Sequence, residues 1–256
     1  MTGLRTAALV GLLVAGCAGE TDVHLLEPAA RPVVLQHRYD FEGRGAALTD
    51  LVGDADGEVL GGALLSDTGE LELDGVDDYV NLPNDLLGDA TAVSLVVWVT
   101  WRGGACWQRI FDFGRSSAGE DVPWEATSSV FVTPATCSAS HVGPVTDGVL
   151  STMFHVGQSV QVSQGTTPLP VDREVQVALT LDAATGLRLY LDGELAAEMN
   201  GETDPSQIVC ENDWLGRSQW GHDAFFYGRF NEFRVYSGAL TAEDVARQFD
   251  RGQDSP

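Results

Sequence analysis

The stretch VQVALTLDAATGLRLYLD, residues 175–192, determines the fold class. Apolar residues occupy every second position in residues 175–181 and again in residues 187–191. A period of two is typical of a β-strand that buries one face. The segment between the two runs, residues 182–186, ends in glycine and has the composition of a turn. The stretch therefore predicts a β-hairpin.

The sequence on either side of this hairpin also favours strands. Residues 93–101 are apolar almost throughout, as expected of a strand covered on both faces, and shorter alternations occupy residues 70–73, 129–132 and 158–163. The chain has 29 glycines, which separate many short strands, and almost no helical periodicity. We therefore expect an all-β fold, a two-sheet antiparallel β-sandwich of the jelly-roll kind.

One short helix is expected near the carboxyl end, from about Thr241 to Phe249. Thr241 is a good amino-terminal cap, and an acid follows three residues later at Asp244, as in a capping box. Leu240 precedes the cap and can pack against Val245, which would fix the direction in which the chain enters the helix.

The amino terminus predicts export and lipidation. Arg5 precedes an apolar run that is too short to span a bilayer, so residues 1–16 are expected to be a signal peptide. Its end, Leu13-Val-Ala-Gly-Cys17, resembles the bacterial lipobox, although an ordinary signal peptide with a stray cysteine remains the alternative. Cys17 is the predicted lipidation site. We expect a lipid anchor on a bacterial membrane, at the outer membrane or cell surface, without a membrane-spanning segment.

The remainder of the chain is expected to form one domain. Residues 17–34 are polar and contain proline, so they are interpreted as a flexible tether. No internal repeat and no shift of composition interrupts the sequence after that point. Residues 35–252 are therefore predicted to be a single domain.

The charge composition excludes several functions. The chain has 14 Lys+Arg against 38 Asp+Glu, a formal net charge of -24, and every one of the 14 is an arginine. Without lysine, neither a phosphate-binding loop of the G-x-x-x-x-G-K-[ST] type nor Schiff-base chemistry is available. An acidic surface also disfavours nucleic acid and anionic lipid headgroups as partners. The acidity is explained by solubility, or more specifically by calcium binding.

Cysteine use follows from the predicted export. Cys106, Cys137 and Cys210 remain after lipidation, in a compartment where disulfides persist. Cys106 leads into one apolar run and Cys137 follows another, so the pair Cys106–Cys137 is favoured if these runs are antiparallel neighbours. Cys210 is then left over. Structural zinc is disfavoured because no C-x-x-C pair occurs.

A series of landmarks along the chain resembles the laminin-G-like jelly rolls of the concanavalin A-like lectin/glucanase superfamily. The landmarks are His37-Arg-Tyr-Asp-Phe-Glu-Gly43, Leu71-Glu-Leu-Asp-Gly-Val-Asp-Asp-Tyr-Val-Asn-Leu-Pro83, Trp107-Gln-Arg-Ile-Phe-Asp-Phe-Gly114, Leu189-Tyr-Leu-Asp-Gly193, Trp214-Leu-Gly-Arg-Ser218 and Gly228-Arg-Phe-Asn-Glu-Phe-Arg-Val-Tyr236. Each is weak alone, but their order is specific. The resemblance implies a domain similar to carbohydrate-binding lectins, usually without catalytic activity.

The same resemblance implies a calcium ion between the first and last strands. Its expected ligands are Glu42, Asp50 and Asn231, and the acids of residues 49–57 have a spacing that suits a hard cation. Asn231 stands where the family commonly has an aspartate, which removes one charged ligand. Calcium is therefore expected as the cofactor, in a site that departs from the family pattern.

Glycoside hydrolases of this superfamily cleave with two carboxylates about 5 Å apart. The nearest pattern here is Glu70-Leu-Glu-Leu-Asp74, which has three acids at alternate positions but in a different order from the hydrolase signature. In the laminin-G-like alignment this run is a strand with its acids towards solvent. No G-x-S-x-G nucleophile motif occurs either. No catalytic residue is nominated.

Tryptophans are the candidates for ligand binding, because an indole ring can stack on a sugar. Trp107 and Trp214 belong to family landmarks and are expected in the core. Trp124 and Trp220 lie in polar loops and are the predicted ligand-binding residues. We therefore expect a non-catalytic surface lipoprotein that binds a glycan or an extracellular protein. A glycoside hydrolase and a structural envelope domain without a ligand are the alternatives.

Overall fold

The computed structural model describes residues 32–137, 145–201 and 203–255. The predicted signal peptide, the lipidation site Cys17 and most of the predicted tether lie outside these residues. In the part of the chain that is described, no helix has the length and apolar composition needed to cross a membrane.

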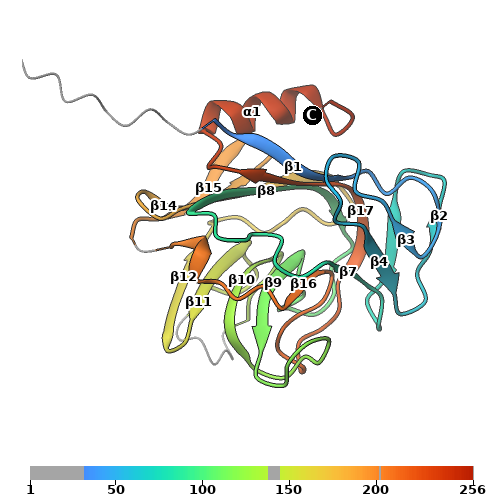
Figure 1. Cartoon of the computed structure of the whole chain (residues 1–256), viewed down its shortest axis with the longest axis horizontal. Coiled ribbons are helices and arrows are strands. Elements are labelled where there is room, and N and C mark those ends of the chain that lie inside the picture. The colour runs from blue at the N-terminus through green and yellow to red at the C-terminus, as the bar shows by residue number, and fades with distance from the viewer. Residues whose placement is uncertain (1–31, 138–144, 202, 256) are drawn as a thin grey trace, which may run out of the picture. The chain divides into compact units, whose positions relative to one another are not determined.

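The described residues form a sandwich of two antiparallel sheets (Figure 1). One sheet has seven strands. In spatial order these are β1 (Val34–Tyr39), β17 (Tyr227–Ser237), β8 (Ala92–Trp101), β13 (Glu174–Asp182), β14 (Gly186–Leu191) and β15 (Glu194–Met199), with β6 (Leu71–Asp74) also paired to β17. The predicted hairpin is confirmed as β13 and β14.

The second sheet has eight strands and forms the other layer of the sandwich. In spatial order these are β12 (Ser159–Gln164), β11 (Ser151–Val156), β10 (Ala126–Thr133), β9 (Phe111–Ser116), β16 (Asn212–Leu215), β7 (Tyr79–Leu82), β4 (Gly57–Leu60) and β3 (Ala47–Leu48). A small pair, β2 (Arg44–Gly45) with β5 (Leu65–Ser66), and the short 3-10 helix Pro205–Gln207 complete the connections. The predicted all-β, two-sheet sandwich is confirmed.

The turn of the hairpin shows why glycine ends it. Gly186 has a φ of 97°, which is in the region that side chains with a Cβ disfavour. A Cβ at this position would lie 2.1 Å from the carbonyl oxygen of Met199 on the neighbouring strand. The close approach of β15 therefore excludes any other residue from this turn.

The core lies between the two sheets. Alternate residues of each strand point into it, and the rings of Phe111 and Phe113 on β9 meet that of Phe233 on β17 at centroid distances of 6.1 and 6.0 Å. These contacts join the two layers. Asp112 lies between Phe111 and Phe113 in the strand, so its side chain points to the outer face of the eight-stranded sheet.

The α-helix α1 (Ala242–Arg251) covers the outer face of the seven-stranded sheet, as Figure 1 shows. Val245 is fully buried in a cluster that contains Trp98, Tyr236 and Leu240. The predicted capping box is present at Thr241, and the helix extends two residues beyond the predicted end at Phe249. The prediction of one short carboxyl-terminal helix is thus confirmed.

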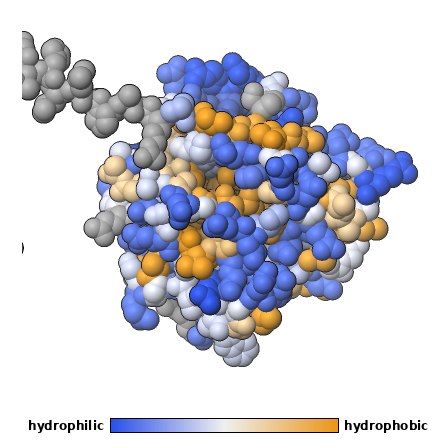
Figure 2. All heavy atoms as spheres, in the orientation of Figure 1, coloured by the Kyte–Doolittle hydropathy of each residue, from blue (hydrophilic) through white to orange (hydrophobic). Residues whose placement is uncertain are grey.

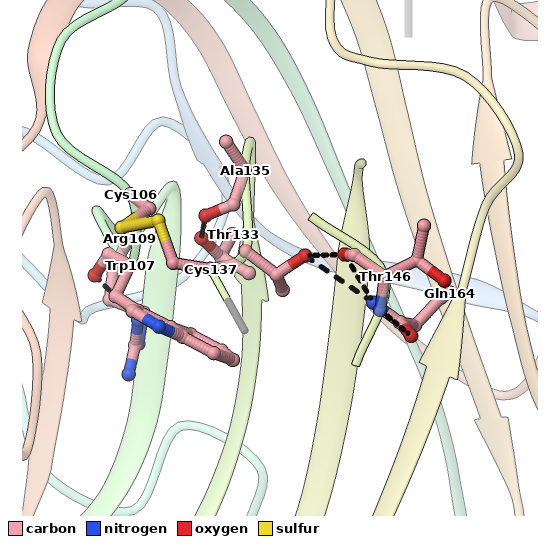
Figure 3. Close-up of a disulfide and its surroundings, with 9 residues drawn as sticks. Cys106, Trp107, Arg109, Thr133, Ala135, Cys137, Thr146 and Gln164 are labelled. Carbon is pink, nitrogen blue, oxygen red and sulfur yellow. Dashed lines mark hydrogen bonds between the residues drawn. A yellow bond between two sulfur atoms is a disulfide. The ribbon is translucent and has the colours of Figure 1, made fainter. Parts of the chain in front are cut away.

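The predicted disulfide is confirmed. Cys106 precedes β9 and Cys137 follows the neighbouring strand β10, and their Cα atoms are 5.8 Å apart across the bond (Figure 3). Close by, the backbone N–H of Trp107 donates to the carbonyl oxygen of Ala135 at 2.8 Å. Cys210 is the free cysteine of the described residues and is buried.

Candidate functional site

Two loops meet on the outer face of the eight-stranded sheet. Residues 117–125 connect β9 to β10, and residues 216–226 connect β16 to β17. The backbone N–H of Trp124 donates to the carbonyl oxygen of Gln219 at 2.9 Å, and the N–H of Gly221 donates to the carbonyl oxygen of Trp124 at 3.0 Å. The two loops are called the loop pair below. They bring both predicted tryptophans, Trp124 and Trp220, side by side.

The two tryptophans have different surroundings. Trp124 is 65% exposed, whereas Trp220 is half-buried. The Trp220 ring meets Phe131 edge-on at 5.7 Å and stacks on His155 at 6.0 Å between centroids. Phe131 and His155 point outward from β10 and β11, because their strand neighbours Val130 and Phe154 are core residues. Trp220 thus packs against the sheet and leaves Trp124 as the exposed ring.

A buried arginine attaches the loop pair to the sheet. Arg109 is 1% exposed, and its guanidinium lies 3.7 Å from the centroid of the Phe131 ring. Its Nη2 donates to Asp223 at 2.6 Å and its Nε donates to Asp112 at 3.2 Å. Its Nη1 donates to the carbonyl oxygen of Trp107 at 2.6 Å. Because a buried charge is costly when unpaired, these contacts hold the Asp223 loop in place.

Asp112 is the acid beneath the loop pair. It is fully buried, and it accepts hydrogen bonds from the Ser129 hydroxyl, the Arg109 Nε and the backbone N–H of Gln219. Burial raises the pKa of Asp112 to about 6, and Arg109 opposes that rise. The Asp112 carboxylate is surrounded by other groups of the protein and has no contact with solvent. Its arrangement is that of a structural ion pair rather than of a group presented to a substrate.

The loop pair borders a shallow, open depression whose enclosed volume is about 20 Å³. Pro123 lines it from one loop, and Arg217, Trp220, Asp223 and Phe225 line it from the other. Typical pockets that enclose a small molecule measure about 300–1,000 Å³. A ligand at this position would therefore lie on the surface rather than inside a cavity.

Arg217 sits at this depression and packs on two aromatic rings. Its guanidinium carbon lies 4.4 Å from the Tyr79 centroid and 4.3 Å from the Trp214 centroid. Trp214 is fully buried, as predicted, but on the outer face of the sheet beneath Arg217 instead of between the sheets. Its Nε1 donates to Asn81 at 2.9 Å. The other tryptophan expected in the core, Trp107, is only partly buried.

The acids of β6 face solvent, as predicted. Leu71 and Leu73 are core residues, while Glu72 and Asp74 between and after them are exposed. Glu72 pairs with Arg102. The run that most resembles a hydrolase signature therefore forms the outer surface of a strand in the seven-stranded sheet.

The residues predicted to bind calcium have other partners. Asp50 is buried, and its carboxylate accepts hydrogen bonds from the backbone N–H groups of Arg38, Val52, Gly53 and Ala55 and contacts His37 at 2.6 Å. Although burial acts to raise it, these bonds lower the pKa of Asp50 to about 2. Asp50 therefore organises the loop after β1, and its role as a calcium ligand stays a prediction.

Asn231 and Glu42 are the other two predicted calcium ligands. Asn231 donates from its Nδ2 to Glu174 at 2.8 Å, and Glu42 is exposed. Since both oxygens of Asp50 already accept several donors, the three residues do not fit a calcium ion. The one acidic cluster found among the described residues is instead Asp74, Asp77 and Asp78, at the turn after β6. There Asp78 accepts from the backbone N–H groups of Ala63 and Asp74.

The roles of two important arginines were not predictable from the sequence. Arg109 and Arg217 were part of recognised landmarks, but their roles depend on Phe131 and Tyr79, which are remote in sequence. Trp124 and Trp220 could be identified because each stands in a polar loop. The hydrogen bonds that join those two loops were not predictable from the sequence, because residues 124 and 220 are far apart in the chain.

The family comparison matches most of the described domain. A family model described as the concanavalin A-like lectin/glucanases superfamily matches residues 74–246. A comparison with curated protein sequences finds no match.

Solved structures share the fold at low sequence identity. Domain 4 of AbnA, a GH43 extracellular arabinanase from Geobacillus stearothermophilus solved with arabinotriose, aligns with a TM-score of 0.62 and 18% identity over 85% of this chain and 98% of that one. Trypanosoma rangeli sialidase aligns with a TM-score of 0.60 and 15% identity, over 84% of this chain and 32% of that one. A structure of botulinum neurotoxin type C, whose cell entry depends on interaction with two ganglioside molecules, aligns with a TM-score of 0.59 and 12% identity, over 83% of this chain and 52% of that one. The alignments show a shared jelly-roll fold.

Proposed function

Because the chain belongs to the concanavalin A-like lectin/glucanase superfamily, we propose that it is a non-catalytic module whose loop pair binds a glycan. The observation that carries this proposal is Trp124. Trp124 is 65% exposed, yet its backbone N–H and its carbonyl oxygen both form hydrogen bonds with the loop that carries Trp220. A large exposed ring on a fixed backbone loses little conformational entropy when a flat sugar face stacks on it.

The surroundings of Trp124 support binding rather than cleavage. The two buried acids at the loop pair are already engaged, since Asp112 and Asp223 both contact Arg109. Glycosidic cleavage requires one carboxyl group that can give up a proton and a second carboxylate that faces the sugar. Neither Asp112 nor Asp223 is free to take these roles.

Two structural relatives support a carbohydrate as the ligand class. The arabinanase domain was solved in complex with arabinotriose, and the type C neurotoxin interacts with two ganglioside molecules. The binding domain of botulinum neurotoxin DC was solved in complex with rat synaptotagmin II, so a protein is the second candidate ligand class. The exposed indole and the shallow depression favour the glycan here.

A glycan array followed by titration calorimetry tests the proposal. We expect binding to one class of oligosaccharide, and Trp124→Ala should weaken it about tenfold or more through loss of the stacking surface. Phe249→Ala is the matched control, because Phe249 is another exposed aromatic residue but lies on α1 over the other sheet. Release of shorter saccharides would indicate a hydrolase, and a blank array would favour a structural domain.

We further propose that the protein is a lipoprotein anchored through Cys17. The lipobox-like end of the amino-terminal segment supports this proposal. Cys17→Ser should yield a product without lipid, because the thioether to diacylglycerol requires that sulfur. Membrane fractionation with lipid labelling measures the change, and unchanged labelling of the variant would contradict it.

A further inference from the structure

Arg217 differs from the other arginines of the domain. The chain carries 38 acidic against 14 basic residues, so an arginine near the surface normally finds a carboxylate. Among the described residues, every arginine except Arg217 and Arg251 forms an ion pair with an acid. Arg251 lies exposed in the last turn of α1, where a positive charge interacts favourably with the helix dipole. Arg217 has no such explanation.

The surroundings of Arg217 leave its guanidinium incompletely satisfied. Its Nη2 donates to the carbonyl oxygen of Asp121 at 3.3 Å, and its Nε is buried without a hydrogen-bond partner. Burial lowers the pKa of Arg217. A group with that desolvation cost would gain from an anionic partner that approaches from the depression.

The nearby acids are committed elsewhere. Asp121 acts on Arg217 electrostatically but makes no ion pair with it, and its Oδ1 accepts from Asn81 at 3.3 Å. Asp223, on the other side of the depression, accepts from Arg109 at 2.6 Å and from the Ser218 hydroxyl at 2.8 Å. Neither carboxylate neutralises the guanidinium by direct contact.

The aromatic contacts fix where Arg217 can bind. Tyr79 and Trp214 support its plane at 4.4 and 4.3 Å, so the guanidinium is held in one orientation. Arg217 lines the same depression as Trp220, whose loop is bonded to that of Trp124. A sugar stacked at the loop pair could therefore reach the guanidinium with a substituent. A fixed, planar guanidinium suits a planar carboxylate, which it can hold by two parallel hydrogen bonds.

We infer that the ligand of the loop pair is an acidic glycan, a saccharide whose sugar carboxylate is bound by Arg217. This inference rests on the proposed glycan-binding function and adds the chemical class of the glycan. The net charge of -24 repels anions at long range, but ionic strength near 0.15 M screens that repulsion beyond about 8 Å. Recognition by Arg217 is a contact interaction and is screened less.

The test uses oligosaccharides in matched pairs, each a uronic-acid form and its methyl ester, which keep the sugar rings but differ in charge. With calorimetry at 0.15 M salt, the native protein should bind the acid about tenfold or more tightly than the ester. Arg217→Gln should abolish this preference while leaving ester binding nearly unchanged. Trp124→Ala should weaken both forms equally. Arg251→Gln, which removes the other unpaired arginine, is the control and should change neither.

The outcomes separate the inference from the proposed function. Equal binding of acid and ester by the native protein, still lost in Trp124→Ala, would overturn the acidic-glycan inference and leave glycan binding intact. No binding of any saccharide would overturn both. A preference for sulfated over carboxylated saccharides would contradict the carboxylate assignment. Arg217→Lys is the second variant if Arg217→Gln does not fold, and it should retain part of the preference because it keeps the charge without the planar fork.

Discussion

Asp213 is a carboxyl group buried at the edge of the core. It is fully buried on β16, where its Oδ2 accepts from the backbone N–H of Leu86 at 3.0 Å and the Cys210 thiol lies within hydrogen-bonding reach of the carboxyl group. Burial raises the pKa of Asp213 to about 8. The side chain is therefore mostly protonated at neutral pH in the folded protein. In the unfolded chain the same group is ionised, because its ordinary pKa is near 3.8.

This difference predicts a falling stability with rising pH. Between the unfolded and folded pKa values, the folded state binds the proton and the unfolded state does not, so the free energy of unfolding decreases from about pH 4 to pH 8. Asp213→Asn removes the contribution of Asp213 to this dependence and should raise the free energy of unfolding at pH 8 by on the order of 1–3 kcal/mol. Urea unfolding at pH 5 and pH 8 measures it. Asp89→Asn, an exposed acid in the neighbouring loop, is the control, and an equal pH slope in native protein and Asp213→Asn would contradict the assignment.

At the scale of single elements, α1 depends on its cap. The Thr241 hydroxyl accepts from the backbone N–H of Asp244 at 3.1 Å, and the Asp244 carboxylate accepts in return from the N–H of Thr241 at 3.1 Å. The hydrogen bond from the Thr241 side chain is the main cause that lowers the pKa of Asp244. Both partners satisfy backbone groups that a helix end otherwise exposes.

Thr241→Ala should therefore destabilise the protein by about 1 kcal/mol. The loss should be visible as a lower midpoint in urea unfolding, without a change in slope. Thr91→Ala, at an exposed threonine that precedes β8, is the control and should change stability little. Equal midpoints for Thr241→Ala and the native protein would show that the cap contributes nothing.

Elements that depend on local sequence were predictable, and those that depend on distant pairing were not. The β13–β14 hairpin and α1 are defined by alternation, a turn and a cap within a short stretch. The position of β16 is different, because this strand inserts between β9 and β7, both remote in sequence. The site follows the same rule: Trp124 and Trp220 were recognisable one by one, whereas the contact of Arg217 with Tyr79 exists only after β16 and β7 have paired.

At the scale of the whole molecule, the acidic charge is carried by the surface. Figure 2 shows that hydrophilic residues cover most of the visible face, with an apolar strip beside α1. A net charge of -24 favours solubility, and salt screens its self-repulsion. Any cation at equal ionic strength should screen it similarly, whereas a calcium site would distinguish ions by size and coordination.

Thermal melts in calcium and magnesium at equal concentration should therefore overlay. The predicted ligand Asp50 already accepts bonds from four backbone amides, so we expect no strong calcium binding at Glu42, Asp50 and Asn231. Saturating binding at a hundredfold excess over the dissociation constant would add about 2.7 kcal/mol to stability. A calcium-specific rise in melting temperature that chelator reverses would contradict this expectation and place a calcium site elsewhere in the chain.

The burial of Cys210 bears on how the chain acquires its disulfide. An unfolded chain in an oxidising compartment exposes Cys106, Cys137 and Cys210 alike, and three different pairs can form, of which one is native. In the folded domain, burial raises the pKa of the Cys210 thiol, so little thiolate is present to attack the Cys106–Cys137 bond. Folding thus ends thiol exchange once the correct pair has formed. Chains that form a wrong pair first must reshuffle before Cys210 can enter the core, which makes disulfide exchange a slow step in reaching the native state.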